Sequence, residues 1–414
     1  MVNFRTFDYK RDQQAVHRIW RETGWIDHGD KDDEEYLDYF LSDCRALVAD
    51  ISDEAECLAV SVPGSIRYLQ KDIPLSAVTA VTTSHVARRQ GFASLLTARL
   101  IAEDAEQGLD VAALGMFEQG YYTRLGFGTG PYQHFLHFDP ADLQVSCEAD
   151  VPLRLSVADY QDVHQALIRR WRSHGGVNLE SAQLVRAEMG WTEKPFGLGF
   201  RDSAGELTHF IWGKAQGETG PYVINSMAYR NREQLLELLA LLVGLSDQVV
   251  SVHLREPSHL QLQDLLKTPL RSLNVSRGAD SRLGATHRSN AYWQLRINNL
   301  ASCLANTSLP GRKTLSFNLT LTDPITKYLS AQQNWRGAGG EYTVHLGEEC
   351  EAVRGHTAGL SLLEASVPGF SRLWLGSACA TALFIVGDIA GPQELITQLD
   401  QTLSLPLPNM DWDF

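Results

Sequence analysis

Hydrophobic residues recur at helical spacing near the start of the chain and in short apolar runs after it. Ala15, Val16, Ile19 and Trp20 lie three or four residues apart, which places them on one face of a helix. The runs that follow are bounded by polar residues and are typical of strands. We expect a second helix over residues 32–44 and strands over residues 46–51, 57–62, 75–83, 111–117 and 133–138.

Another helix is predicted to begin near Gly91, soon after a strand ends. Leu95, Leu96, Leu100 and Ile101 follow at helical spacing, so we expect these side chains to point inward. The order strand, helix, strand indicates that the strand over residues 111–117 lies beside the strand over residues 75–83.

The middle of the chain repeats this order of elements. A strand is predicted over residues 222–229, a helix over 232–245 and a strand over 249–254. The match is one of element order and length, with negligible residue identity, and it favours a decayed duplication.

The last part of the chain has a different pattern. Strands over residues 314–320, 342–346 and 359–364 precede helices over 368–376 and 392–403. Helices grouped on one face of a sheet are typical of an α+β domain. Pro406 and Pro408 then keep the C-terminal tail extended.

These patterns divide the 414 residues into three predicted domains, because one domain usually spans ~100–200 residues. We expect domains over residues 1–147, 148–298 and 299–414. The predicted fold class is mixed, with α/β character in the first two domains and α+β character in the third.

Net charge and composition narrow the classes of partner. The formal net charge of −14 argues against a general nucleic-acid binder, whose affinity comes from Lys and Arg. It suits a cationic small molecule or a basic peptide, although acidity also serves solubility alone. The first residues hold no apolar signal-peptide core, and no apolar run approaches the ~20 residues of a membrane span. Because no such span is present, we expect no membrane partner. The six cysteines include no CxxC pair and are typical of reduced thiols, so we expect a cytoplasmic protein.

Two neighbouring histidines are candidate ligands for a metal ion. His134 and His137 form an HxxH pair, but residues three apart in a strand face opposite sides of a sheet. We therefore expect no shared metal ion there, and no metal cofactor.

The most informative stretch links the strand over residues 75–83 to the helix near Gly91. It reads Arg88-Arg89-Gln90-Gly91-Phe92-Ala93. A helix N-terminus offers unpaired N–H groups and a partial positive charge, which together bind a phosphate. The small residues let the backbone approach that phosphate, and the arginines add positive charge. The alternative is an ordinary helix cap with flanking arginines.

A second stretch follows the strand over residues 111–117 and reads Gly120-Tyr121-Tyr122-Thr123-Arg124-Leu125-Gly126-Phe127-Gly128. Together the two stretches resemble the GNAT superfamily of acetyl-CoA-dependent N-acetyltransferases. The first is similar to the superfamily's Arg/Gln-x-x-Gly-x-Gly/Ala pyrophosphate signature. Tyr122-x-x-Leu125-Gly126-Phe127 is similar to its Tyr-x-x-Phe/Leu-Gly-Phe/Tyr segment.

In organisation the whole chain resembles the Eis (enhanced intracellular survival) acetyltransferases. That family has tandem GNAT-fold domains followed by an α+β domain similar to a sterol carrier protein, and an aromatic C-terminal residue. In the second domain Arg230-Asn231-Arg232 opens the helix without a glycine, so we expect only the first domain to bind acetyl-CoA. The resemblance also implies a homo-oligomer, a hexamer.

The resemblance implies roles for individual residues. Tyr122 would be the general acid for the departing thiolate, and the terminal carboxylate of Phe414 the general base. Trp25, Asp27 and Asp413 would line the amine pocket. The acetyl-CoA site would comprise Val81, Thr82 and Thr83 at the acetyl and pantetheine portion, Arg88, Arg89, Gln90, Gly91, Phe92, Ala93 and Ser94 around the pyrophosphate, and Phe117 and Glu118 where the two strands separate.

Acid–base chemistry supports these two catalytic roles and qualifies one. A Tyr hydroxyl of pKa near 10 matches a thiol near 8.5, so it can protonate a departing thiolate. An α-carboxylate of pKa about 3.5 is too weak a base to deprotonate an alkylammonium near 10 outright. We therefore expect the carboxylate of Phe414 to anchor the amine and take its proton once bond formation has made the nitrogen acidic. No cysteine lies in either motif, so transfer is expected to be direct.

The predicted function is acetyl transfer from acetyl-CoA to a primary amine of an aminoglycoside-like, polyamine-like or lysine-containing acceptor. One alternative is a non-catalytic lipid-binding or scaffold protein with a relic acetyltransferase domain. A second is a GNAT enzyme that uses a longer acyl-CoA. Tyr122 as a packing aromatic and Phe414 as a disordered end are the corresponding alternatives for the two catalytic residues.

Overall fold

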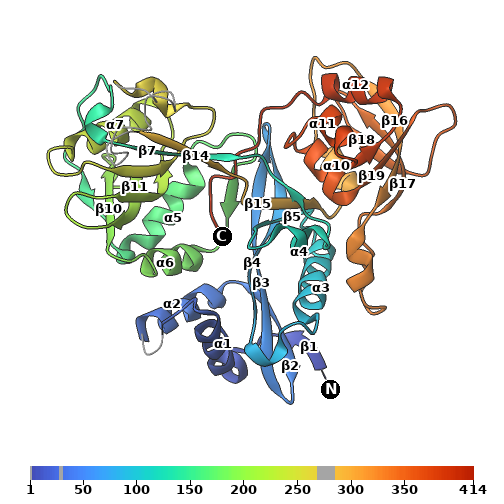
Figure 1. The fold of residues 1–414 in the computed structure, drawn as a ribbon, viewed down its shortest axis with the longest axis horizontal. Helices are drawn as coiled ribbons and strands as arrows, with labels where there is room; N and C mark the ends of the chain where they lie inside the picture. The colour runs from blue at the N-terminus through green and yellow to red at the C-terminus, as the bar shows by residue number, and fades with distance from the viewer. Residues whose placement is uncertain (1, 28–30, 268–284) are drawn as a thin grey trace, which may run out of the picture.

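The computed structural model describes residues 2–27, 31–267 and 285–414, and within these residues the named strands form three sheets. Three lobes are visible in Figure 1. The N-terminal part of the chain forms the lower lobe, the middle part the upper left lobe and the last part the upper right lobe. This arrangement agrees with the predicted mixture of α/β and α+β character.

The first sheet has eight of the described strands, in the order β1-β2-β3-β4-β5-β15-β6, with β9 paired to β3. Helices cover both of its faces: Leu47 of β2 shares a buried cluster with Leu96 of α3, whereas its neighbour Val48 shares one with Ile19 of α1. The elements of this lobe are β1 (Val2–Thr6), α1 (Tyr9–Thr23), α2 (Lys31–Ser42), β2 (Arg45–Ile51), β3 (Glu54–Tyr68), β4 (Lys71–Thr83), α3 (Phe92–Glu106), β5 (Val111–Gly115), α4 (Gln119–Thr123), β6 (Gly128–Thr129), β9 (Val177–Leu179) and β15 (Trp293–Ile297).

Two predictions for this lobe need correction. Leu95 is 37 % exposed, whereas Leu96, Leu100 and Ile101 are buried, because the buried face of α3 follows the i, i+4 spacing of Leu96 and Leu100. The strand predicted over residues 111–117 ends at Gly115, where the chain leaves the sheet and turns into α4.

The second sheet has seven described strands in the order β14-β7-β13-β12-β11-β10-β8. It repeats the parallel geometry of the first sheet, since β12 pairs parallel with β13 just as β4 does with β5. Its elements are β7 (Gln133–Phe138), β8 (Leu153–Arg154), α5 (Tyr160–Arg169), α6 (Ala182–Gly190), β10 (Pro195–Arg201), β11 (Leu207–Ala215), β12 (Tyr222–Ala228), α7 (Arg232–Gly244), β13 (Val252–Arg255) and β14 (Thr286–Asn290).

The first two sheets exchange strands. β7 precedes residue 147 in the chain but lies between β13 and β14 of the second sheet. β15 follows the second lobe in the chain but lies between β5 and β6 of the first sheet. The predicted domain boundaries at residues 147 and 298 stay predictions. The strand before residue 147, β7, belongs to the second sheet, and the strand before residue 298, β15, belongs to the first sheet.

The third sheet has five described strands in the order β18-β17-β16-β19-β20, and its helices α10, α11 and α12 lie together in the upper right of Figure 1. Its elements are α9 (Leu300–Ala305), β16 (Leu315–Thr322), β17 (Gly340–Leu346), β18 (Glu351–Arg354), β19 (Leu362–Ser366), α10 (Val367–Trp374), α11 (Ala380–Ile385), β20 (Ile389–Ala390) and α12 (Gln393–Thr402).

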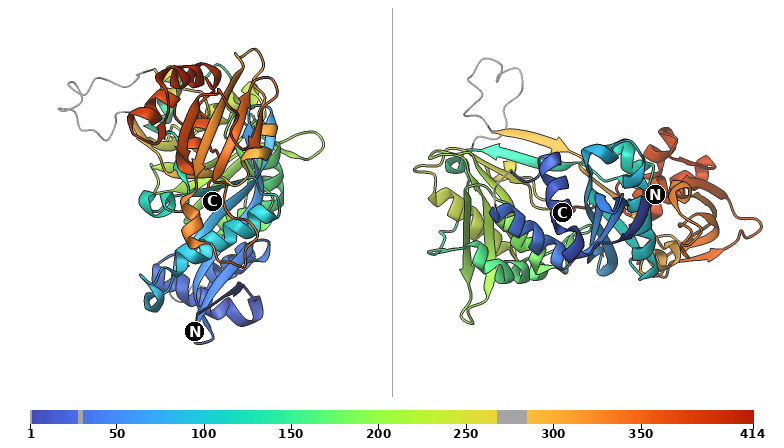
Figure 2. Two further views of the ribbon diagram at one scale, coloured as in Figure 1. Left: turned by 90° about the vertical axis from the view of Figure 1, so that its right-hand side faces the viewer. Right: turned by 90° about the horizontal axis from the view of Figure 1, so that it is seen from below.

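The tail after α12 leaves the third lobe and runs back to the centre of the molecule, where both Figure 1 and the right-hand view of Figure 2 place the C-terminus. The tail has no helix or strand, as Pro406 and Pro408 predict. Among the described residues, no helix combines the length and apolar character that crossing a membrane requires.

Candidate active site

The central feature of the first lobe is the point where β4 and β5 separate. The two parallel strands pair only at Leu75–Val111, Ser76–Ala112 and Ala77–Ala113. β4 continues to Thr83 and β5 to Gly115, so their last residues are not paired with each other. This separation leaves main-chain groups of β4 free to meet an extended ligand.

A bulge changes the direction of β4 just beyond that point. Thr79 pairs with Val60 and Thr82 with Leu58, so two residues of β4 stand opposite one of β3. Ala80 has φ +50°, a left-handed conformation that is unusual for a residue with a side chain. Bulges of this kind redirect a strand beside functional sites. The bulge comprises Ala80 and Val81, so it includes the first of the predicted ligand-facing residues Val81, Thr82 and Thr83.

The loop from β4 into α3 has the geometry of a phosphate site. Arg88, Arg89, Gln90 and Gly91 are exposed, and Arg89 and Gly91 have φ +62° and +80°. No side chain caps α3, and Leu95 N–H is the first to donate within the helix, to Gly91 O at 3.2 Å. The N–H groups of Phe92, Ala93 and Ser94 at this helix start are therefore available to an anion.

The corresponding helix of the second lobe begins differently. Asn231 caps α7, and its side-chain oxygen accepts a hydrogen bond from Gln234 N at 3.0 Å. A side chain thus occupies the position that a phosphate takes at an uncapped helix start. This cap gives a physical reason for the expectation that only the first domain binds acetyl-CoA.

Tyr122 lies on α4, beside the end of β5. Its side chain is 8 % exposed and its ring contacts Tyr121 and Phe127 edge to face. Burial raises the pKa of Tyr122, and the neighbouring Tyr121 raises it further. A raised pKa keeps the phenol protonated, as a general acid requires, but it also makes the phenol a weaker acid than an ordinary tyrosine toward a thiolate of pKa near 8.5.

The turn after Tyr122 is held by a buried ion pair from other parts of the chain. Arg296 of β15 donates to Leu125 O and binds Asp323 at 2.7 Å, and both side chains are fully buried. Gly126 has φ +91°, and a Cβ built there would lie 2.4 Å from Nη1 of Arg296. The glycine of the Tyr-x-x-Leu-Gly-Phe segment is therefore required both by backbone conformation and by space.

Polar contacts hold the C-terminal tail on the second lobe. Arg170 binds Asp411 with two bonds of 2.6 and 3.0 Å, and Arg255 binds both Met410 O and the carboxylate of Asp413. Trp412 is buried between these anchors. An ordered tail contradicts the alternative of a disordered C-terminal end.

The tail brings the terminal carboxyl group of Phe414 to β5. A Cβ built on Gly115 would lie 3.4 Å from the main-chain oxygen of Phe414. Gly115 is the last residue of β5, at the point where β4 and β5 have separated. The terminal carboxyl group thus comes to the same end of β5 that α4 and Tyr122 follow in the chain.

A cavity of about 510 Å³ opens beside the tail, between α6 and β11. Among the described residues that line it are the carboxylates of Glu188, Glu193, Asp411 and Asp413, against one cationic side chain, Lys214. Its aromatic residues are Trp191, Trp212 and Trp412. Carboxylates and indole faces are the groups that attract an organic cation.

Glu188 has an unusual environment in this cavity. Burial raises the pKa of Glu188 well above its ordinary value, and the carboxylate of Asp413 raises it further. Asp411 and Asp413 already have arginine partners, so Glu188 and Glu193 are the acidic lining residues best placed to meet a new cation.

Not every residue that the resemblance implied faces these features. Asp413 lines the cavity, whereas Trp25 and Asp27 are exposed and are not among its lining residues. Trp25 packs edge to face on Trp20, whose ring lies 5.5 Å from that of Trp191 in the cavity wall.

Phe117 and Glu118 lie in the short segment between β5 and α4. Phe117 is 94 % exposed, and the carboxylate of Glu118 caps α4 by accepting from Gly120 N at 3.0 Å. The predicted contacts of Phe117 and Glu118 with acetyl-CoA stay predictions.

Sequence reasoning missed several lining residues. Glu188 and Trp191 come from α6 and its C-terminal end, a helix that the sequence did not predict. The signal present was Glu188-Met189-Gly190-Trp191, an acidic and aromatic residue pair at a helix end.

Comparison with known proteins matches the first lobe to a domain family. Residues 7–130 match the model of the acetyltransferase (GNAT) domain. An uncharacterized N-acetyltransferase of Streptomyces avermitilis is 25 % identical over 410 residues, which cover 90 % of this chain and 89 % of that protein.

Solved structures match the chain over its full length. A probable N-acyltransferase from Enterococcus faecalis V583 has a TM-score of 0.81 at 17 % identity, and Eis1 from Mycobacterium abscessus has a TM-score of 0.76 at 16 % identity. A GCN5-related N-acetyltransferase from Anabaena variabilis has a TM-score of 0.79 at 14 % identity. All of this chain and all of each of those three chains are covered.

Proposed function

Because the chain is a GNAT N-acetyltransferase with the Eis-like fold, we propose that it transfers acetyl from acetyl-CoA directly to a primary amine of a cationic acceptor. The observation that carries the proposal is the terminal carboxyl group of Phe414 against Gly115, at the separation of β4 and β5. Asp413, the preceding residue, lines the acidic and aromatic cavity, so the cavity and the terminal carboxyl group are adjacent in the tail.

The uncapped start of α3 is the proposed pyrophosphate site. A GNAT domain implies an acyl-CoA donor, and the free N–H groups of Phe92, Ala93 and Ser94 fit the diphosphate of that donor. Arg88 and Arg89 supply positive charge in an otherwise acidic protein. When bound, acetyl-CoA would supply the acetyl group and depart as a thiol.

The proposed proton transfers use the C-terminal carboxylate and a tyrosine of the first lobe. The carboxylate of Phe414 holds the acceptor's ammonium, which loses one proton to water and becomes the neutral amine that attacks the acetyl carbon. The carboxylate takes the second proton once the new bond has made the nitrogen acidic. Tyr122, whose buried phenol is protonated, gives its proton to the departing sulfur. The two transfers leave the carboxyl group protonated and Tyr122 deprotonated, with their summed charge unchanged, and proton exchange through water restores both groups.

The cavity wall sets the proposed acceptor class. Glu193, and Glu188 once it is ionised, attract cationic groups, and the indole rings of Trp191 and Trp212 offer faces for cation–π contacts. Aminoglycoside-like, polyamine-like and lysine-bearing molecules all carry several such cations. We propose these three classes as acceptors.

The test measures release of free CoA from acetyl-CoA with a panel of such amines. We expect release with at least one cationic amine, and we expect Tyr122→Phe to lower kcat by about 10²-fold or more. Tyr121→Phe is the matched control, because it removes the adjacent hydroxyl from the same helix. Equal kcat in Tyr122→Phe and wild type would remove Tyr122 from the mechanism, and no release with any amine would refute the proposed function.

A further inference from the structure

A group of three metal-ligating side chains lies outside the acceptor cavity, in the second lobe. His134 is on β7, His287 is on the neighbouring β14, and Glu256 follows the last residue of β13. One ligand atom from each of the three lies within 4.8 Å of the others. His137, the partner considered from the sequence, instead bonds Ser251 at 2.7 Å.

The two imidazoles are already close enough to share one ion. Nδ1 of His134 and Nε2 of His287 are 3.0 Å apart, and the rings stack with centroids 4.9 Å apart. Donor atoms around a tetrahedral zinc ion lie about 3.3 Å apart, given Zn–N bonds of about 2.0–2.1 Å. The two nitrogens therefore need to move apart by only a few tenths of an ångström, and the rings need to rotate out of their 23° stack so that both nitrogens point at one ion.

The backbone holds the carboxylate of Glu256 beside these rings. Glu256 N donates to His134 O at 2.9 Å, and Oε1 accepts from Leu262 N at 2.9 Å. Oε2 lies 4.0 Å from Nε2 of His287. One carboxylate oxygen is thus fixed by the protein, and the other faces the imidazole pair.

We propose that His134, His287 and Glu256 form a structural site for a divalent transition-metal ion of the zinc class. Two imidazoles and one carboxylate are a donor set that suits Zn²⁺, with water as the fourth ligand. In the free protein the two ring nitrogens lie within hydrogen-bond distance of each other, and the ion would take the place of that contact. The ion ties β14, whose residues are all exposed, to β7 and to the segment after β13.

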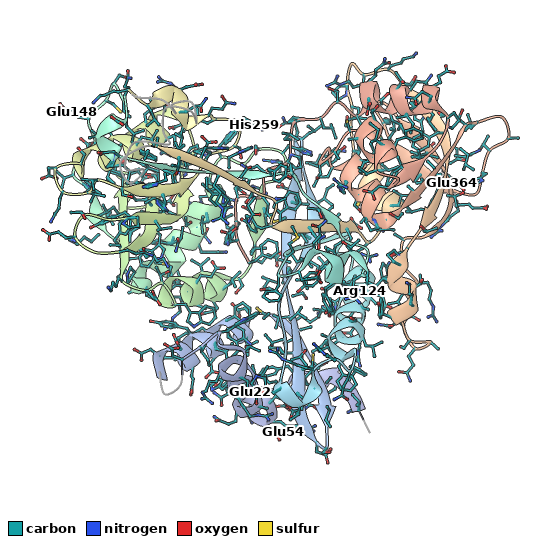
Figure 3. The ribbon with its side chains drawn as sticks, viewed as in Figure 1. Glu22, Glu54, Arg124, Glu148, His259 and Glu364 are labelled. Carbon is teal, nitrogen blue, oxygen red and sulfur yellow. The ribbon has the colours of Figure 1, made fainter. Side chains whose placement is uncertain are left out.

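The position of the site suggests what the metal stabilises. The three residues line a cavity of about 390 Å³ together with His259 and Asn409 of the tail. His259 is labelled in Figure 3, where the second lobe approaches the centre of the molecule. Gln133, next to His134, donates to Asn409 Oδ1 at 3.3 Å and to Met410 O. The ion would therefore stiffen a strand that holds the tail.

The test uses the full chain without an affinity tag, stripped with a chelator and titrated with Zn²⁺ by calorimetry. We expect one Zn²⁺ per chain and a rise in Tm with Zn²⁺ concentration. His134→Ala, His287→Ala and Glu256→Gln should each weaken binding by at least about tenfold, since even loss of an outer-shell partner costs that much. Mg²⁺ should not bind, because imidazole is a poor ligand for it.

His259→Asn is the matched control, because His259 lines the same cavity but is not one of the three grouped residues. Its Zn²⁺ affinity should equal that of the wild type. Circular dichroism of each stripped variant checks that the fold is intact. Absence of stoichiometric binding to the wild type, or binding that survives the double change His134→Ala and His287→Ala, would overturn the proposal.

Discussion

Arg170 and Asp411 form a two-point ion pair that joins the second lobe to the C-terminal tail. The side chain of Arg170 is only 3 % exposed, and it also donates to Leu167 O and Val177 O. These contacts hold its guanidinium in place independently of the tail. Asp411 lies three residues from the terminal carboxyl group. The pair therefore connects the packing of the second lobe to the placement of Phe414.

Asp411→Asn tests that connection. The change leaves a buried guanidinium without its counter-charge, so we expect the free energy of unfolding to fall by about 3 kcal/mol or more. We also expect kcat to fall, because the tail loses its main anchor. Urea denaturation and CoA release measure the two effects. Glu206→Gln is the control: it breaks the exposed pair with Arg169 and should cost about 1 kcal/mol or less.

The charge of the terminal carboxyl group is tested by converting it to an amide through protein ligation. The amide keeps Phe414 and every other side chain but cannot hold an ammonium ion or accept its proton. We expect kcat to fall by about 10²-fold with little change in Tm. A ligated chain with the native carboxylate is the control. An amide chain with wild-type kcat would show that another group is the base.

Gly126→Ala tests the turn after Tyr122. The new Cβ would strain a residue at φ +91° and displace the Arg296 guanidinium, so we expect losses in both stability and kcat. Gly108→Ala is the matched control, because Gly108 has φ +87° with open space around it. Conformational strain alone costs about 1–2 kcal/mol. Equal destabilisation of the two variants in urea would mean that Arg296 does not matter here.

Arg89→Gln tests the proposed pyrophosphate site. Removing one positive charge at the start of α3 should raise the KM for acetyl-CoA about tenfold and leave kcat nearly unchanged. Arg99→Gln, within α3 and away from its start, is the control, since Arg99 binds Glu103 at 2.7 Å. A KM for acetyl-CoA that rises equally in both variants would count against a specific role for Arg89.

The acceptor cavity should show a distinctive pH dependence. Because burial raises the pKa of Glu188, its carboxyl group is neutral below that raised value and ionised above it. A cationic acceptor binds better to the ionised form. The KM for the acceptor should therefore fall as the pH rises through the raised pKa, until the acceptor loses its own protons. Glu188→Gln should abolish this fall, and a variant with the wild-type profile would exclude Glu188.

The sequence predicted the positions of the helices and strands better than it predicted which strands pair with each other. The apolar runs and the spacing of Leu96, Leu100 and Ile101 gave the strands and α3, because burial imposes a period on each element. The same periodicity says nothing about which strand lies beside which. The exchange of β7 and β15 between sheets depends on contacts between residues more than a hundred positions apart, and no local pattern records it.

The residues of the candidate site also fall into two groups, those that local sequence predicts and those that only tertiary packing brings together. Gly91 and Tyr122 lie in contiguous motifs whose chemistry is local, so they could be found from sequence. Glu188 and Trp191 face the cavity only because α6 packs beside the tail, which is a tertiary relationship. The exposure of Phe117 was equally invisible, because the chain leaves the sheet two residues before it.

The exchange of β7 and β15 also bears on how the molecule unfolds. A fragment that stops near residue 147 would carry β7 without its neighbours β13 and β14, and it would lack the strand that joins β5 to β6. Each sheet is thus complete only when the other has formed. The first two lobes should therefore melt as one cooperative unit, and the lobe whose helix α7 is capped remains indispensable to the lobe with the proposed phosphate site.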